Sequence, residues 1–209
     1  EVMPPKFKFT REEIVSAALD VVHKYGGGRL TARDVAKELG VSTQPLFTCF
    51  RNMADFKKEV VNAAENLYYD YLNSGLSEYI PFFGLGKAYI RFAKEEPEIY
   101  KFLFLTPPSD YFGGAVSAVA KTKNLVRPWL TDIYKMTDNQ ADVFFRNVWL
   151  VAHSIASLIV TNVCPYTDEE IGKILTETSL ATVKAIKEIP NFESGDFNKD
   201  EIFKGLINK

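Results

Sequence analysis

Hydrophobic residues recur at three- and four-residue steps along most of the chain, which is the spacing of one face of an α-helix. The first such stripe runs from Ile14 to Tyr25 and stops at three successive glycines, residues 26–28. Strands would instead show a sustained alternation of apolar and polar residues between hairpin turns, and no such run occurs in the sequence. The pattern therefore predicts an all-α protein.

Helix start signals recur within this pattern. In each one a threonine or asparagine precedes, by three residues, a carboxylate or amide that can reach back to it, which satisfies free N–H groups at a helix N-terminus. The pairs are Thr10 with Glu13, Thr31 with Asp34, Asn52 with Asp55, Thr137 with Gln140, and Thr167 with Glu170. The predicted helices after the first cover residues 31–39, a short segment capped by Ser42 with Pro45 in its first turn, and residues 53–74, 81–95, 97–105, 109–134, 138–163 and 168–188. About nine helices result, followed by a polar tail after Pro190.

Residues 30–50 predict a helix, a glycine turn and a short second helix, preceded by a packing helix. This is the order of a helix-turn-helix DNA-binding domain, whose second helix enters the major groove. Gly40 can adopt the left-handed conformation that ends the first of the two helices, and Leu46 and Phe50 anchor the second. The outward side of the second helix then carries Thr43, Gln44, Phe47 and Thr48.

The outward residues have side chains that suit DNA. Gln44 can pair with adenine, the threonines can reach base edges or phosphates, and Phe47 can pack on a sugar or a thymine methyl. Thr31 and Ser42, at helix N-termini, can offer hydroxyl and backbone donors to phosphates. A capped helical hairpin with a glycine turn also occurs in α-helical proteins that never bind DNA, so the geometry leaves both interpretations open.

Charge is distributed unevenly along the chain. The net charge of −2 argues against indiscriminate binding to nucleic acid. Between Lys6 and Lys58, however, ten Lys and Arg residues face six Asp and Glu residues, a local balance of +4. A modestly basic N-terminal segment on an acidic remainder favours a selective polyanion binder, although such a split also arises by chance.

The run TARDVAKELGVSTQPLFTCFRNMADFKKEV, with the helix FTREEIVSAALDVV ahead of it, resembles the N-terminal domain of TetR-family transcriptional regulators. The resemblance covers roughly the first 60 residues and includes the order, the spacing and the preceding helix. It implies binding of double-stranded DNA through a short recognition helix. The expected DNA-binding residues are Thr31, Arg33, Ser42, Thr43, Gln44, Phe47, Thr48 and Lys57.

Two positions depart from the family pattern. Phe47 stands where the family usually has tyrosine, and Met53 stands where it usually has lysine. Both family residues commonly contact phosphate, so this chain lacks one hydroxyl and one charge there. Arg51, Lys57 or Lys58 is expected to compensate.

A weaker resemblance covers the body of the chain. The segments YIRFAKEEPEIYKFLF (residues 89–104) and WLVAHSIASL (residues 149–158) are similar to the effector-binding half of a TetR subgroup with a tryptophan followed four residues later by His-Gly; here Ser154 replaces the glycine. The candidate ligand-binding residues are Tyr89, Phe92, Tyr100, Phe104, Trp149 and His153. Each aromatic residue can equally belong to the core, and His153 can be a structural hydrogen-bond donor.

The resemblance also implies a homodimer in which the last two long helices meet their copies. Independent support comes from residues 144–160, which are apolar nearly all round, so that one face can fill the core while another needs a partner. The small residues Ser179, Ala181, Thr182 and Ala185 would permit close approach. The alternative is a helix buried entirely inside a monomer. A dimer would place two recognition helices roughly 34–36 Å apart on a palindromic operator.

Catalytic and metal-binding patterns are missing from the sequence. Cys49 and Cys164 lie far apart, and the two histidines, His23 and His153, do not complete a cluster with them. Glu95 and Glu96 lie beside Pro97, at an expected solvated turn, and not in a pocket. We therefore expect no enzyme, no metal site and no cofactor.

Features of membrane and secreted proteins are also missing. The longest uncharged apolar run, residues 148–160, is shorter than the roughly 20 residues of a bilayer span. No basic leader followed by an apolar segment opens the chain. We expect a cytoplasmic protein without a membrane segment.

The sequence thus predicts a helix-turn-helix domain over residues 1–52, an effector-binding and dimerisation bundle over residues 53–190, and a C-terminal tail over residues 191–209. The expected function is that of a homodimeric transcriptional repressor, released from its operator by a small, largely apolar ligand. Repression is the family default. The alternative is a helical ligand-binding or interaction module with weakened DNA binding.

Overall fold

A computed structural model describes residues 9–77, 81–106 and 114–207. Within these ranges it holds ten α-helices and no strand, which confirms the all-α prediction. The helices are α1 (Arg11–Tyr25), α2 (Ala32–Glu38), α3 (Gln44–Cys49), α4 (Met53–Leu76), α5 (Pro81–Glu95), α6 (Pro97–Tyr100), α7 (Gly114–Asp132), α8 (Asp138–Val160), α9 (Asp168–Glu188) and α10 (Lys199–Ile207). A 3-10 turn, η1 (Gly27–Arg29), joins α1 to α2, and a π-helical segment, η2 (Lys101–Leu105), follows α6 directly.

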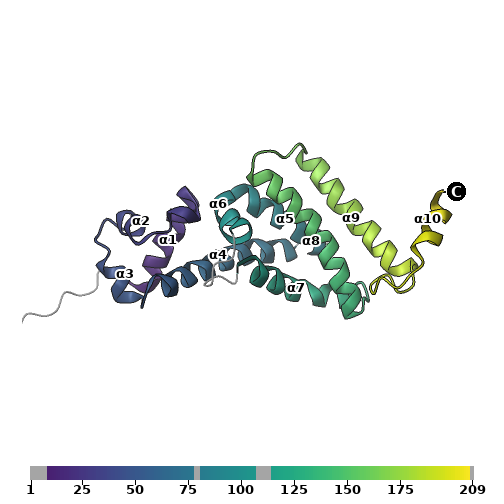
Figure 1. The fold of residues 1–209 in the computed structure, drawn as a ribbon, viewed down its shortest axis with the longest axis horizontal. Coiled ribbons are helices and arrows are strands. Elements are labelled where there is room, and N and C mark those ends of the chain that lie inside the picture. The colour runs from purple at the N-terminus through teal and green to yellow at the C-terminus, as the bar shows by residue number, and fades with distance from the viewer. Residues whose placement is uncertain (1–8, 78–80, 107–113, 208–209) are drawn as a thin grey trace, which may run out of the picture.

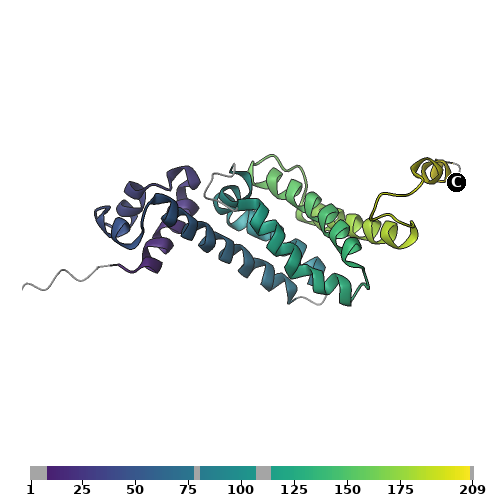
Figure 2. The ribbon, with the colours of Figure 1, turned by 60° about the horizontal axis from the view of Figure 1, so that its bottom comes forward.

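The molecule is elongated, and its two ends are different (Figure 1). Helices α1 to α3 with η1, here called the N-terminal unit, lie at one end. The long helix α4 starts beside them and runs into the helical body, which we define as α4 to α9 (Figure 2). Helix α4 packs on α1 at its start and on α5 further along. The N-terminal unit is therefore joined to the body through one continuous helix as well as through side-chain contacts.

The predicted helix caps are largely confirmed. Full capping boxes form at the N-termini of α1, α8 and α9. At α2 and α4 the cap residue accepts the expected backbone N–H, but the aspartate does not complete the box. Aspartate is one methylene shorter than glutamate, and the Asp55 carboxylate accepts instead from the backbone N–H of Arg51 (3.2 Å).

The predicted cap at Ser42 is wrong. Helix α3 begins at Gln44, with Thr43 as N-cap and no side-chain capping bond. A cap at Ser42 would place Pro45 at the third helical position, where a proline has no N–H to donate. The proline therefore moves the start of the helix by one residue.

Two other predicted segments differ from the structure. The single helix expected over residues 97–105 is divided into α6 and η2. The predicted tail contains α10, whose N-terminus is capped by Asn198 through the backbone N–H of Glu201 (3.1 Å). Residues 109–113 of the predicted helix 109–134 lie outside the described residues. Helix α10 stands at the far end from the N-terminal unit with its apolar side chains Phe203 and Leu206 exposed.

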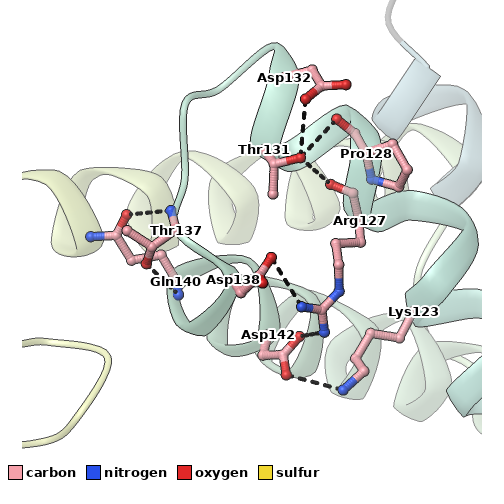
Figure 3. Close-up of polar contacts among 9 residues, drawn as sticks. All are labelled: Lys123, Arg127, Pro128, Thr131, Asp132, Thr137, Asp138, Gln140 and Asp142. Carbon is pink, nitrogen blue, oxygen red and sulfur yellow. Dashed lines mark hydrogen bonds and ion pairs between the residues drawn. The ribbon is translucent and has the colours of Figure 1, made fainter.

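An ion-pair cluster fixes the corner between α7 and α8 (Figure 3). The Arg127 guanidinium binds the carboxylates of Asp138 (3.1 Å) and Asp142, and the Lys123 ammonium binds Asp142 as well (3.0 Å). Asp138 and Asp142 stand one turn apart on α8, so a single arginine spans both. The two helices are thereby held as one wall of the body.

Helix α8 is the most apolar long helix in the described part of the chain. By length and composition alone it could cross a membrane, and 44% of its most apolar 18-residue window is buried inside the structure. It contacts α5, α6, α7 and α9, which is the position of a core helix. Within residues 143–160 only Arg146, Leu150 and Ser154 are exposed, at four-residue steps along one side of the helix.

Candidate functional site

Helix α3 has two opposed faces. Leu46 and Phe50 point inward, and Phe50 is only 2% exposed. Gln44, Phe47 and Thr48 are exposed, and their spacing of three and four residues places them on one face. The Phe47 side chain is 52% exposed, which is unusual for a large aromatic residue. Thr43 is half-buried at the start of the helix.

A glycine turn sets the angle between α2 and α3. Gly40 has φ +67°, and the N–H groups of Gly40 and Val41 bond the carbonyls of Lys37 (3.1 Å) and Ala36 (2.9 Å). These two bonds form the Schellman motif that ends many helices with a left-handed residue. Any other L-residue would be strained at this φ. The prediction that Gly40 ends the first helix is confirmed.

Arg11 of α1 clamps the far end of α3. Its guanidinium lies 4.2 Å from the centroid of the Phe50 ring and donates to the Cys49 carbonyl (2.8 Å). It also pairs with Asp55 (3.5 Å) and Glu59 (3.3 Å) of α4. The sequence interpretation counted Arg11 only as a charge, because a contact across 38 positions has no local signal.

Two of the predicted DNA-binding hydroxyls are already engaged. The Thr31 hydroxyl accepts from the Asp34 N–H (3.1 Å) and donates to the Asp34 carboxylate (2.7 Å). The Thr48 hydroxyl donates to the Gln44 carbonyl (2.9 Å). Ser42 is exposed, and its hydroxyl forms no hydrogen bond with any described residue.

Positive side chains flank α3. Lys24 and Arg29 of the N-terminal unit pair with Glu38 and Asp34. The remaining described cations, on α2 and around the start of α4, form no ion pair with a described residue. These are Arg33, Lys37, Arg51, Lys57 and Lys58. Among the described residues of this end, the cations without an ion pair therefore lie on α2, just before α4 and in the first turns of α4.

The helical body contains a cavity of about 380 Å³. Helices α4, α5, α7, α8 and α9 line it together with Tyr134 from the connection between α7 and α8. The apolar lining comes chiefly from Leu72, Leu85, Phe145, Val148, Leu175 and Leu180. Among the described residues, the lining contains no Asp, Glu, Lys, Arg or His side chain. Such an apolar space of this size is typical of a site for a small organic ligand.

The candidate ligand-binding residues divide into two groups. Tyr89 and Trp149 line the cavity. Phe92, Tyr100, Phe104 and His153 lie outside its lining, in an aromatic cluster around Tyr68; ring centroids are 5.2 Å apart for Tyr68 and Phe92 and 5.0 Å apart for Tyr100 and Phe104. His153 stacks on Trp149 at 4.7 Å, so the cluster directly supports one wall of the cavity.

A hydrogen-bond network links the two groups. The Tyr100 hydroxyl lies 2.8 Å from His153 Nδ1, and the Tyr89 hydroxyl lies 3.1 Å from the same nitrogen and 3.4 Å from the Tyr100 hydroxyl. Burial raises the pKa of both phenols and lowers the pKa of the His153 imidazole. A neutral imidazole accepts from a phenol at Nδ1, so the network is uncharged near neutral pH.

The body meets the N-terminal unit through η2 and the start of α6. A Cβ atom on Gly27 would lie 2.5 Å from Cδ2 of Phe102, so the η2 aromatic ring packs directly on η1. Next to it, His23 Nδ1 of α1 lies 2.5 Å from the Glu96 carboxylate. The same π-helical segment carries Phe104 of the aromatic cluster. One short segment thus contacts both regions.

Neither the protein-family models nor the curated proteins give a match to this chain.

Proposed function

We propose that this chain is a ligand-responsive transcriptional regulator of the TetR type, a homodimeric repressor that a small, largely apolar ligand releases from DNA. The observation that carries the proposal is the pair of faces on α3. Gln44, Phe47 and Thr48 are exposed at one end of the molecule, whereas Leu46 and Phe50 fix the helix beneath them. An exposed aromatic residue beside an amide on a short, rigidly held helix suits contact with base edges.

The division of labour on DNA follows from these positions. Gln44 pairs with a base, and Phe47 and the Thr48 methyl pack on sugars or thymine methyls. The unpaired cations Arg33 and Lys57 contact phosphates, which position the protein without reading sequence.

The homodimer is supported by the outward surface of α8 and α9. Leu150 of α8 and Leu180 of α9 are large apolar side chains that lie exposed, and Leu180 is 66% exposed. Ala181 is exposed beside it. Thr182, in contrast, is buried within the chain at 8% exposure, so it drops out of the proposed contact. A second copy on this surface would cover side chains that water otherwise meets.

Regulation couples the cavity to the recognition helices. A ligand that favours one packing of the aromatic cluster acts through Phe104 and Phe102 of η2 on Gly27, and so on the angle of the N-terminal unit. A coupling free energy of about 1–3 kcal/mol changes operator occupancy by one to two decades.

The test is binding to DNA from the region upstream of the protein's own gene, measured by fluorescence anisotropy between about 50 and 200 mM salt. Affinity should fall steeply as salt rises. Gln44→Ala should relax base preference, and Lys57→Ala should weaken all sequences alike. Lys204→Ala, on α10 at the opposite end, is the control and should change neither. Salt-independent or undetectable binding contradicts the proposal.

A second candidate function is a helical ligand-binding or interaction module with weakened DNA binding. Phe47 and Met53 favour it, because neither offers a phosphate contact and Met53 packs against the core. Under this alternative the protein binds ligands in the cavity but shows no salt-dependent affinity for DNA, so the same assay separates the two.

A further inference from the structure

We propose that α10 is an arm that packs on a second copy of this chain, so that each subunit of the homodimer receives the apolar side of the other subunit's α10. That side carries Phe203, Leu206 and Ile207. The inference rests on the homodimer of the proposed function and goes beyond it, because the contact it adds lies outside α8 and α9.

Helix α10 has an apolar side that the described residues of its own chain leave uncovered. Phe203 and Leu206 are each 64% exposed and Ile207 is 80% exposed. Steps of three and four residues from Phe203 place all three on one side of the helix. None of the nine residues of α10 is buried. Large apolar side chains that gather in this way on a surface mark a contact site.

A helix as short as α10 needs support from packing. It spans nine residues, and isolated helices shorter than about 12–15 residues are only marginally stable in water. The polar contacts that the structure describes for it are local. The Asn198 side chain accepts from the Glu201 N–H (3.1 Å), and the Lys199 ammonium lies 5.9 Å from the centroid of the Phe197 ring. The cap fixes where the helix begins, and the apolar side is where a partner can stabilise it.

The connection from α9 holds α10 away from the helical body. The Phe192 ring packs against the core and stacks on the Phe197 ring with centroids 5.5 Å apart. The Gly195 N–H, at a φ of +75°, donates to the Phe192 carbonyl (3.2 Å), so the connection is a folded turn. In both views α10 stands clear of α4 to α9 (Figure 1, Figure 2). Its apolar side is therefore placed to meet another molecule rather than its own body.

Charge and position favour a second copy as that molecule. The two lysines of α10 are balanced by one aspartate and one glutamate, whereas a helix that binds an anionic membrane carries an excess of Lys and Arg. The arm also follows directly from α9, whose exposed Leu180 belongs to the proposed dimer surface. A two-fold axis at this surface brings both arms to equivalent positions on the two subunits. One kind of contact then covers both apolar sides.

Sedimentation velocity of the full chain over a range of concentrations tests the inference through the dimer dissociation constant. Phe203→Ser should weaken the dimer about tenfold or more, because a two-fold dimer loses the contact in both arms at once, and Leu206→Ser should act in the same direction. Lys204→Ser is the matched control. It lies on the polar side of α10 and also replaces a better helix former by serine, so it should change the dissociation constant by less than about twofold.

Photo-cross-linking shows directly which chain the arm contacts. Phe203→p-benzoylphenylalanine places a light-activated group on the apolar side, and illumination should produce a covalent dimer on a denaturing gel. In a mixture of chains with ordinary and heavy nitrogen, mass spectrometry of the cross-linked peptides should show one peptide from each kind of chain. The same group at Lys204 should give little covalent dimer.

Three results would overturn the inference: equal dissociation constants for Phe203→Ser and Lys204→Ser, cross-links from position 203 that stay within one chain, or a protein that is monomeric at every concentration. Binding to vesicles of phosphatidylcholine and phosphatidylglycerol that Phe203→Ser abolishes, with the dimer unchanged, would assign the apolar side to a membrane instead.

Failure of the proposed function has a different signature. A dimer with the expected cross-links and the expected response to Phe203→Ser that does not bind DNA contradicts the regulatory role and leaves the arm intact. A dimer that binds DNA and is unaffected by Phe203→Ser contradicts the arm alone.

Discussion

The outward face of α3 and the central cavity use polar groups in opposite ways. On α3 the side chains that matter are exposed, adjacent along one helix and held by buried anchors beneath them. In the cavity five helices contribute the lining, and the hydroxyls of Thr122, Thr176 and Ser179 are already bonded to backbone carbonyls of their own helices. Substitutions on the outward face of α3 should therefore leave stability nearly unchanged, whereas substitutions in the cavity wall also change the packing of the core.

The largest expected effect is the difference in stability between alanine substitutions at Phe50 and at Phe47, three residues apart. Phe50→Ala removes a fully buried ring that contacts Phe56 at 5.1 Å, and it should lower the free energy of unfolding by about 3–4 kcal/mol. Phe47→Ala should lower it by less than about 0.5 kcal/mol, because surface substitutions cost little, while it weakens DNA binding. Urea unfolding of both variants measures this. Equal losses of stability would show that α3 is not presented as described.

Filling the cavity is expected to lower the affinity for a ligand about tenfold or more. Gly86 of α5 lines the cavity, and a Cβ there would meet Leu175 at an ordinary 3.5 Å, so Gly86→Leu can place its side chain in the empty space. Gly172→Leu on α9 is the control, since a Cβ there meets nothing within 4 Å. Each substitution should stabilise its helix by about 1 kcal/mol, because leucine has a higher helix propensity than glycine. Calorimetric titration with benzophenone and 2-acetylnaphthalene should distinguish the two variants, and equal affinities would place the ligand elsewhere.

Gly40→Ala is expected to lower the free energy of unfolding by about 1–2 kcal/mol. Alanine is strained at a φ of +67°, although no atom blocks its Cβ. Gly28→Ala serves as its control, since its Cβ also meets open space and its φ is not positive. Denaturant unfolding gives the stability, and DNA affinity reports the change in angle between α2 and α3. A neutral Gly40→Ala would mean that the turn does not fix that angle.

The smallest expected effect is a pH dependence from His153. Burial lowers the pKa of its imidazole in the folded state, so the unfolded chain, with an ordinary pKa of about 6.5, binds the proton more readily. Stability should therefore be unaffected by this group above that value and fall as the pH drops below it. The loss between pH 7.5 and pH 5.5 should be larger for the unaltered protein than for His153→Gln. Identical pH profiles would show that His153 is solvated.

What the sequence predicts well is what lies close together along the chain. Gln44, Phe47 and Thr48 follow from helical spacing within five residues, and Gly40 follows from the residue type that a left-handed turn requires. Of the six ligand candidates, Tyr89 and Trp149 lie in the cavity wall, and the other four do not: Phe92, Tyr100, Phe104 and His153.

Contacts between distant residues escaped the sequence interpretation for a physical reason. No local pattern indicates that Arg11 reaches Cys49, or that Thr122, Leu175 and Ser179 share one cavity, because helix packing decides these neighbours. The division of residues 97–105 into α6 and η2 likewise depends on the packing of Phe102 and Phe104 against two different regions. Helix α10 is a different case, because its cap, Asn198 with Glu201, was readable from the sequence and was missed.

The clamp that Arg11 forms around Phe50 and Cys49 has an evolutionary consequence. The backbone of α3 is held by its buried anchors, by the Gly40 turn and by the bond from Arg11 to its final carbonyl. The three outward positions 44, 47 and 48 can therefore vary with little loss of stability. Under the proposed function, substitutions at these three positions can change the DNA site that is recognised while the fold that supports α3 stays the same.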